Sequence, residues 1–152
     1  MNEVTITTNR AEETISLGHK IGANLRGGEI IELASDLGGG KTSLAKGIVK
    51  GAGSQDLVSS PSFTICNEYK CLKFKIYHFD FYRLSEPGIV RRELEEVMNN
   101  PSSVIILEWP EVVENVIPKE HIVIQIDSPG KNNRDLTIKY TKDLKYIVAG
   151  LK

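Results

Sequence analysis

The amino-acid sequence predicts an α/β domain of the P-loop NTPase type, with three layers around a mixed, largely parallel sheet and an antiparallel hairpin. Two observations carry this prediction. A strand-like run at 29–34 leads into the glycine-rich stretch 35–43, and a helix-like run follows it. Residues 104–107 form an uninterrupted apolar run, which is typical of a strand buried on both faces of a parallel sheet.

The N-terminal elements precede the glycine-rich stretch. Residues 4–7 alternate between apolar and polar side chains like a short strand. Asn9 and Glu12 then have the spacing of a capping box and predict the start of a helix, which the glycines at 27–28 end. A second helix, at 42–50, is predicted directly after the glycine-rich stretch.

The remaining elements alternate between strand and helix. Two β-rich runs predict a hairpin that turns near Lys70 and Cys71. A charged amphipathic run predicts a helix that residues 99–101 end. The predicted ranges are 63–69 and 72–80 for the hairpin, 90–98 for the helix, 104–107 for the buried strand, 112–117 for a short helix or turn, and 122–126 and 136–140 for two late strands.

Length and composition predict one domain over residues 1–152. The net charge of −1 excludes a free-standing basic nucleic-acid binder. No apolar run reaches the roughly 18 residues of a membrane span, and residues 1–3 lack the basic start of a signal peptide. Cys66 and Cys71 are the only cysteines, and we expect them to be reduced thiols in a cytoplasmic protein.

The glycine-rich stretch has the composition of a phosphate-binding loop. Consecutive glycines let backbone N–H groups converge on phosphate oxygens, and the following helix start adds unpaired N–H donors. Lys41 can reach the β- and γ-phosphates, and the Thr42 hydroxyl can bind Mg²⁺. The alternative is a glycine-rich turn with a chance lysine. The predicted nucleotide-binding residues are Asp36, Leu37, Gly38, Gly39, Gly40, Lys41, Thr42 and Ser43.

A carboxylate follows the buried apolar run. Glu108 stands at the carboxyl end of strand 104–107, where ligands of open α/β sheets bind. In P-loop proteins, a strand beside the loop strand ends in an acid that helps to hold magnesium. The sequence therefore predicts Glu108 as a magnesium ligand, the alternative being a surface carboxylate. Trp109 is interpreted as a core or rim aromatic residue.

Two further polar groups accompany the hairpin. His78 and Asp80 lie on one face of the predicted strand 72–80, where they can position water, sense the γ-phosphate or accept a proton. The alternative is a hydrogen-bonded pair at a sheet edge. The hydroxyl cluster at 59–64 predicts either a loop that orders around the γ-phosphate or a plain turn.

Together, these motifs resemble the TsaE (YjeE) family, the ATPases of bacterial tRNA threonylcarbamoyladenosine biosynthesis. The family pattern contains G-D-L-G-A-G-K-T, S-P-T-F-T, H-x-D-x-Y-R and I-E-W-P-E, and its order and spacing match over residues 5–126. Ser35, Gly39 and Ser62 depart from the pattern, and segment 87–103 does not match the family's usual acidic, glycine-containing helix. The matching segments are 35–42, 60–64, 78–83 and 107–111.

The resemblance implies a protein that binds ATP with Mg²⁺ and hydrolyses it slowly alone. It implies TsaD and TsaB as partners, which transfer a threonylcarbamoyl group to the adenosine next to the anticodon of certain tRNAs. Contact with tRNA is expected through this complex, and the motifs contain no obvious arginine finger, which a partner can supply.

The resemblance also implies a role for each site residue. Lys41 would hold the β- and γ-phosphates, while Thr42 and Glu108 would hold magnesium. Asp80, with His78, would act at the γ-phosphate as the hydrolytic or switch element. The remaining candidates for nucleotide contact are Glu111 and Arg134, the latter as a cover for the adenine.

Three rival functions share the glycine-rich loop. A GTPase would need an N/T-K-x-D element, but the nearest text, residues 141–144, has leucine where the aspartate is required. A P-loop small-molecule kinase is the main enzymatic alternative. It would need an arginine-bearing lid, for which only Arg91 and Arg92 are available. A non-catalytic nucleotide sensor is the third possibility.

Overall fold

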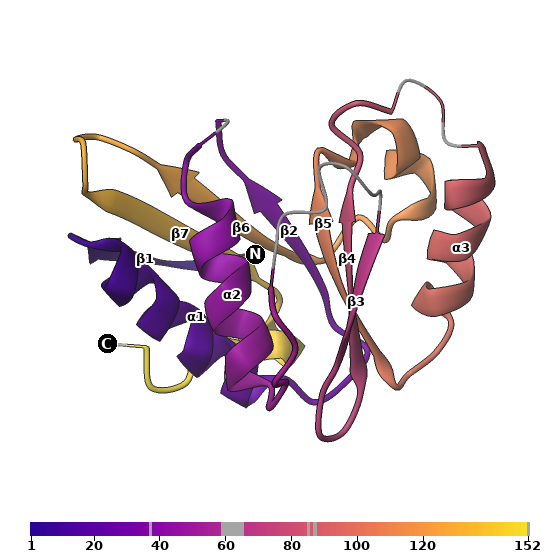
Figure 1. Cartoon of the computed structure of the whole chain (residues 1–152), viewed down its shortest axis with the longest axis horizontal. Helices are drawn as coiled ribbons and strands as arrows, with labels where there is room; N and C mark the ends of the chain where they lie inside the picture. Colours follow the sequence, from indigo (N-terminus) through magenta and orange to yellow (C-terminus); the bar gives the residue numbers. More distant parts are fainter. Residues whose placement is uncertain (37, 59–65, 85, 87, 152) are drawn as a thin grey trace.

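The computed structural model contains one seven-stranded sheet with the order β1-β7-β6-β2-β5-β4-β3 (Figure 1). It describes residues 1–36, 38–58, 66–84, 86 and 88–151. Strands β6, β2, β5 and β4 run parallel, and the pairs β1/β7, β6/β7 and β3/β4 are antiparallel, which confirms the predicted sheet and hairpin. The strands are β1 (Asn2–Thr8), β2 (Ile30–Ala34), β3 (Cys66–Lys70), β4 (Lys75–Asp80), β5 (Ser103–Glu108), β6 (Ile122–Asp127) and β7 (Arg134–Tyr140).

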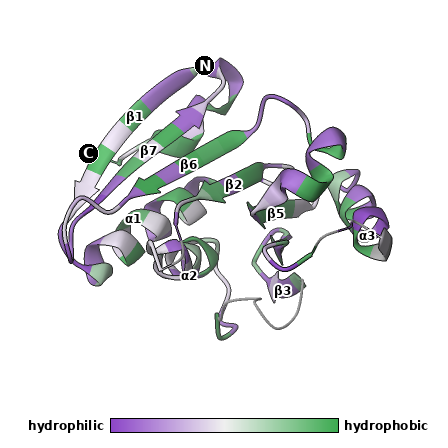
Figure 2. Cartoon of the chain, turned by 90° about the horizontal axis from the view of Figure 1, so that it is seen from above, coloured by the Kyte–Doolittle hydropathy of each residue, from purple (hydrophilic) through white to green (hydrophobic). Residues whose placement is uncertain are grey.

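Helices cover both faces of this sheet, which gives the predicted three layers. Helices α1 (Ala11–Asn24) and α2 (Lys41–Gly51) lie side by side against one face, and α3 lies on the far side of β5 (Figure 2). Helix α3 (Gly88–Met98) and the 3₁₀ segment η1 (Pro110–Val116) pack on the opposite face. A second 3₁₀ segment, η2 (Lys142–Val148), contacts α1 near the end of the chain.

Strand β5 divides the hydrophobic core into two parts. Val104 and Ile106 face the larger cluster, which lies between the sheet and helices α1 and α2. Ile105 and Leu107 face the smaller cluster under α3 and η1. All four side chains are at most 1% exposed, so the apolar run is buried on both faces as predicted.

Glycines set the spacing between α1 and α2. Gly18 and Gly22 of α1 face Gly47 and Gly51 of α2, and each pair is one helical turn apart. A methyl group added to Gly47 would lie 2.1 Å from the carbonyl oxygen of Ile15, and one added to Gly22 would lie 2.0 Å from that of Ile48. The helices therefore touch backbone to backbone, and this contact supports the start of α2.

The structure corrects the predicted start of the first helix. The residue before the helix is Arg10, with extended backbone angles and no side-chain capping bond. The carboxylate of Glu13 accepts the Asn9 N–H at 3.0 Å, so the predicted partner, Glu12, was wrong by one residue. The extended backbone at Arg10 shifts the helix start and brings Glu13 to the place expected for Glu12.

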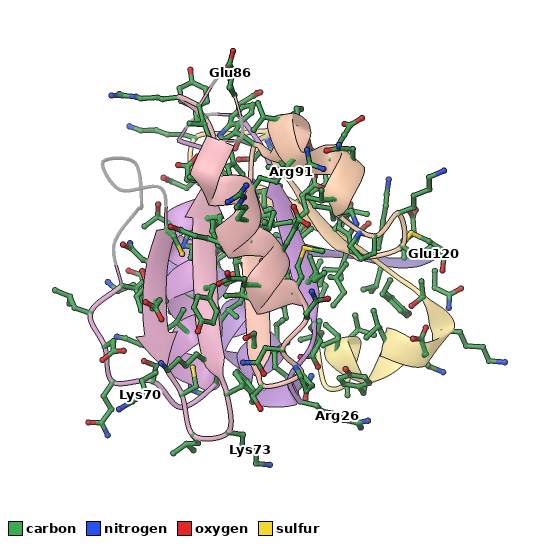
Figure 3. The ribbon with its side chains drawn as sticks, turned by 90° about the vertical axis from the view of Figure 1, so that its right-hand side faces the viewer. Arg26, Lys70, Lys73, Glu86, Arg91 and Glu120 are labelled. Atoms are coloured by element: carbon green, nitrogen blue, oxygen red, sulfur yellow. The ribbon has the colours of Figure 1, made fainter. Side chains whose placement is uncertain are left out.

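The other predicted elements agree with the structure near their expected ranges. The second hairpin strand begins at Lys75 instead of residue 72, and residues 63–65 of the first lie outside the described part. Lys70 and Lys73 extend outward from the hairpin turn (Figure 3). Cys66 and Cys71 are free thiols, and burial raises their pKa values to about 12 and about 11. No helix in the described residues is long and apolar enough to cross a membrane.

Candidate functional site

The glycine loop, residues 35–40, joins β2 to the first turn of α2 at the upper edge of the sheet in Figure 1. Gly38 and Gly40 have φ values of 77° and 106°, which side chains disfavour. The Gly39 N–H donates to the Asp36 carbonyl at 3.0 Å, and a methyl group on Gly39 would lie 2.4 Å from Ser35 Oγ. The backbone of the loop thus favours glycine at positions 38 and 40, and at position 39 an added side chain would displace the Ser35 hydroxyl. Its free face and the helix start behind it fit a phosphate group.

Lys41 is folded back over this loop. Its side chain is only 8% exposed, and Nζ donates to the Ser35 carbonyl at 3.3 Å. The same Nζ lies 3.9 Å from Glu108 Oε1 and 4.5 Å from the centre of the Trp109 ring. The lysine charge is therefore held by a carbonyl, a carboxylate and an aromatic face.

The carboxyl ends of β4 and β5 bring three predicted residues together beside Lys41. Asp80 pairs with Glu108 in the parallel register of these strands. His78 Nε2 lies 2.5 Å from Glu108 Oε2, and both side chains are buried. Among the described residues, His78 Nδ1 has no hydrogen-bond partner. Asp80, which is only partly buried, is thus the more accessible of the two polar residues predicted on β4.

The environment of Asp80 favours its protonated form. Burial raises its pKa, and the nearby Glu108 carboxylate adds to the rise. The Tyr82 N–H donates to Asp80 Oδ1 at 3.0 Å and opposes the shift, as do His78 and Lys41. A carboxylate with a raised pKa is a stronger base than an ordinary aspartate, so Asp80 suits proton transfer or the orientation of water.

Thr42 and Glu108 supply the oxygen donors that a magnesium site needs. Thr42 follows Lys41 in the first turn of α2 and is exposed. Mg²⁺ in nucleotide sites is bound by one or two protein oxygens together with phosphate oxygens and water. A hydroxyl in the helical turn that begins at Lys41 and a carboxylate 3.9 Å from the Lys41 ammonium fit that requirement.

Trp109 is a site residue for which the sequence analysis predicted no functional role. Its φ of 53° is the only positive value at a non-glycine position in the described chain. This backbone turn places the indole between the Lys41 ammonium and the Tyr82 ring, whose centre lies 5.1 Å away. The one available signal was its position, directly after a predicted strand end and before Pro110.

Two cavities flank the glycine loop. One, of about 330 Å³, is lined by residues that include Asp36, Trp109 and Glu111. The other, of about 100 Å³, lies between the starts of α1 and α2 and is lined by Ser43 and Arg134. Arg134 Nε donates to the Gly39 carbonyl at 3.0 Å, so this side chain contacts the loop itself. Each of the predicted nucleotide contacts outside the loop therefore borders it.

Some predicted residues are not placed at the site. Leu37 and the hydroxyl cluster at 59–64 lie outside the described residues. Arg91, a candidate for a kinase lid, points outward from α3 and pairs with Glu95 at 3.2 Å (Figure 3). Because α3 packs on the face of the sheet opposite α2, Arg91 is not positioned over the glycine loop.

Comparisons with known proteins agree with this geometry. A family model described as "Threonylcarbamoyl adenosine biosynthesis protein TsaE" matches residues 8–136. A Bacillus subtilis protein named tRNA threonylcarbamoyladenosine biosynthesis protein TsaE is 32% identical over 90% of this chain and 85% of its own length. A Rickettsia conorii protein of the same name is 33% identical over 84% and 73%. The crystal structure of Bacillus subtilis YdiB superposes with a TM-score of 0.81 at 28% identity, covering 99% of this chain and 94% of that one.

Proposed function

Because the chain belongs to the TsaE family of threonylcarbamoyl adenosine biosynthesis proteins, we propose that it is the Mg²⁺-dependent ATPase subunit of this tRNA modification pathway. The observation that carries the proposal is the meeting of Lys41 and Glu108 at the mouth of the glycine loop, 3.9 Å apart. A cation for phosphate and a carboxylate for a hard metal ion are the two parts that a P-loop ATPase requires here.

Each residue has a defined part in this proposal. ATP binding draws the Lys41 ammonium from the Ser35 carbonyl and Trp109 to the β- and γ-phosphates, while the loop N–H groups hold phosphate oxygens. Thr42 and Glu108 would hold the magnesium ion, which would supply neutralisation of the phosphate charge. Asp80 orients the attacking water and accepts its proton, a task that suits its raised pKa.

The proposed activity is slow in the isolated chain and faster with TsaD and TsaB. Arg134 donates to the carbonyls of Gly39, Lys131 and Asn133, so it is engaged by the chain's own backbone. An arginine from a partner can complete such a site and accelerate hydrolysis by a large factor. The net charge of −1 agrees with tRNA contact that is shared with partners.

The test follows phosphate release at a fixed ATP concentration while TsaD and TsaB are titrated into the purified chain. We expect slow release from the chain alone and a marked increase with both partners present. Replacing Asp80 by Asn should remove the increase and leave ATP bound. Fast hydrolysis that is indifferent to the partners, or phosphate transfer to a small acceptor, would instead support an independent ATPase or a kinase.

A further inference from the structure

The buried imidazole of His78 has no direct task in the proposed ATPase mechanism. Its side chain is 1% exposed and lies behind Glu108, away from solvent. In the parallel register, His78 is paired with Ile106, and its ring contacts the carboxylate of Glu108, two positions further along β5. Because the Glu108 carboxylate contacts both this imidazole and Lys41, His78 can influence the nucleotide site through Glu108.

We propose that His78 is a positioning residue, which fixes the Glu108 carboxylate in the orientation that binds magnesium. The inference rests on the proposed ATPase function and adds a role for a residue behind the metal ligand. His78 Nε2 occupies Oε2 of Glu108, and this leaves Oε1 directed toward Lys41 and the glycine loop. Partners that hold a metal-binding side chain in place in this way commonly change metal affinity when they are removed.

The distribution of protons supports this direction of action. An ionised carboxylate can only accept hydrogen bonds, so Nε2 of His78 must be the donor. The other ring nitrogen, Nδ1, is buried without a hydrogen-bond partner among the described residues. An unsatisfied buried polar atom lowers stability. If this buried strand position served stability alone, an apolar side chain would be favoured. The hydrogen bond to Glu108 therefore explains why a histidine occupies it.

The experiment compares the ATP affinity with Mg²⁺ to the affinity with EDTA, and the ratio of the two measures the contribution of the metal. Trp109 is the only tryptophan and lies against Lys41, so its fluorescence reports binding. The variants are His78→Leu, which removes the donor, His78→Gln, which keeps an N–H donor, Glu108→Gln, and the double variant His78→Leu/Glu108→Gln. Circular dichroism confirms that each variant is folded.

We expect His78→Leu to lower the affinity ratio by roughly 10- to 100-fold, the range seen when partners of metal ligands are removed. His78→Gln should retain most of the ratio, and the double variant should lose no more than Glu108→Gln alone. Should His78→Leu fail to fold, His78→Asn, whose shorter amide stays polar and falls short of Glu108, takes its place. An unchanged ratio in a folded donor-free variant, or additive losses in the double variant, would overturn the inference while leaving the ATPase proposal intact. Absence of ATP binding by the unaltered chain would overturn both.

Discussion

Replacement of Gly47 by alanine separates what helix propensity predicts from what the contact between α1 and α2 dictates. Alanine is the better helix former by about 1 kcal/mol, so propensity alone predicts a more stable chain. In the structure, the added methyl group would lie 2.1 Å from the Ile15 carbonyl oxygen and 3.0 Å from Gly18 Cα. These neighbours are backbone atoms, which cannot rotate away, so the two helices must move apart.

The expected size of the effect follows from these two opposing terms. Overpacking of a well-filled interior destabilises a protein by roughly 1–3 kcal/mol, and rigid backbone neighbours favour the upper end of that range. After the gain of about 1 kcal/mol in helix propensity, we expect a net loss of about 2 kcal/mol. For a chain of this length, such a loss lowers Tm by roughly 4–8 °C.

The assay is thermal unfolding of Gly47→Ala followed by circular dichroism, together with ATP affinity, because α2 begins at Lys41. The matched control is Gly130→Ala, since a methyl group there would meet nothing closer than 3.9 Å. The control should stay within about 0.5 kcal/mol of the unaltered protein. An unchanged or higher Tm for Gly47→Ala would refute the close helix contact.

Three further predictions concern single charged groups. Lys41→Ala should weaken ATP binding roughly 10- to 100-fold without unfolding the chain, because it removes a positively charged hydrogen-bond donor to the phosphates. Calorimetric titration measures this change in affinity. Asp80→Asn should retain ATP, lose hydrolysis and raise the Tm of the nucleotide-free chain at neutral pH, because a raised folded pKa means that ionised Asp80 opposes folding there. His121 bonds Glu32 Oε1 and the Pro118 carbonyl, and chiefly the bond to Glu32 raises its pKa above 6.5. The bond between protonated His121 and Glu32 therefore stabilises the folded chain below pH 6.5, and this stabilisation is lost as the pH rises through the raised pKa of the folded state. In urea unfolding, His121→Gln should lower the free energy of unfolding by roughly 0.5–1 kcal/mol at about pH 5 and by less at about pH 8.

The elements and the meeting of the main site residues could be predicted because both depend on local pattern and on one topological rule. The run 104–107 is apolar on both faces, and only a central parallel strand buries such a run. Once β4 and β5 are parallel, Asp80 and Glu108 end at the same edge of the sheet as the glycine loop.

Other features depend on tertiary contacts that no local pattern encodes. Alternation places His78 and Asp80 on one face of β4. Although Asp80 is the register partner of Glu108, the Glu108 side chain contacts His78, and this choice depends on the three-dimensional packing. The left-handed backbone at Trp109 is uncommon for a residue with a side chain. The bond from Arg134 to Gly39 joins residues 95 positions apart. Sequence spacing carries no information about such a contact.

The most direct test of the account is the amount of threonylcarbamoyladenosine formed in tRNA by a mixture of TsaD, TsaB, the threonylcarbamoyl donor, ATP and Mg²⁺. The chain is supplied unaltered, omitted, or supplied as Lys41→Ala. We predict continued tRNA modification only with the unaltered chain, because Lys41, which lies against the Ser35 carbonyl and Glu108, is the cation that we propose for phosphate binding. Equal modification in all three mixtures would contradict the central claim that this chain drives the pathway through its ATP site.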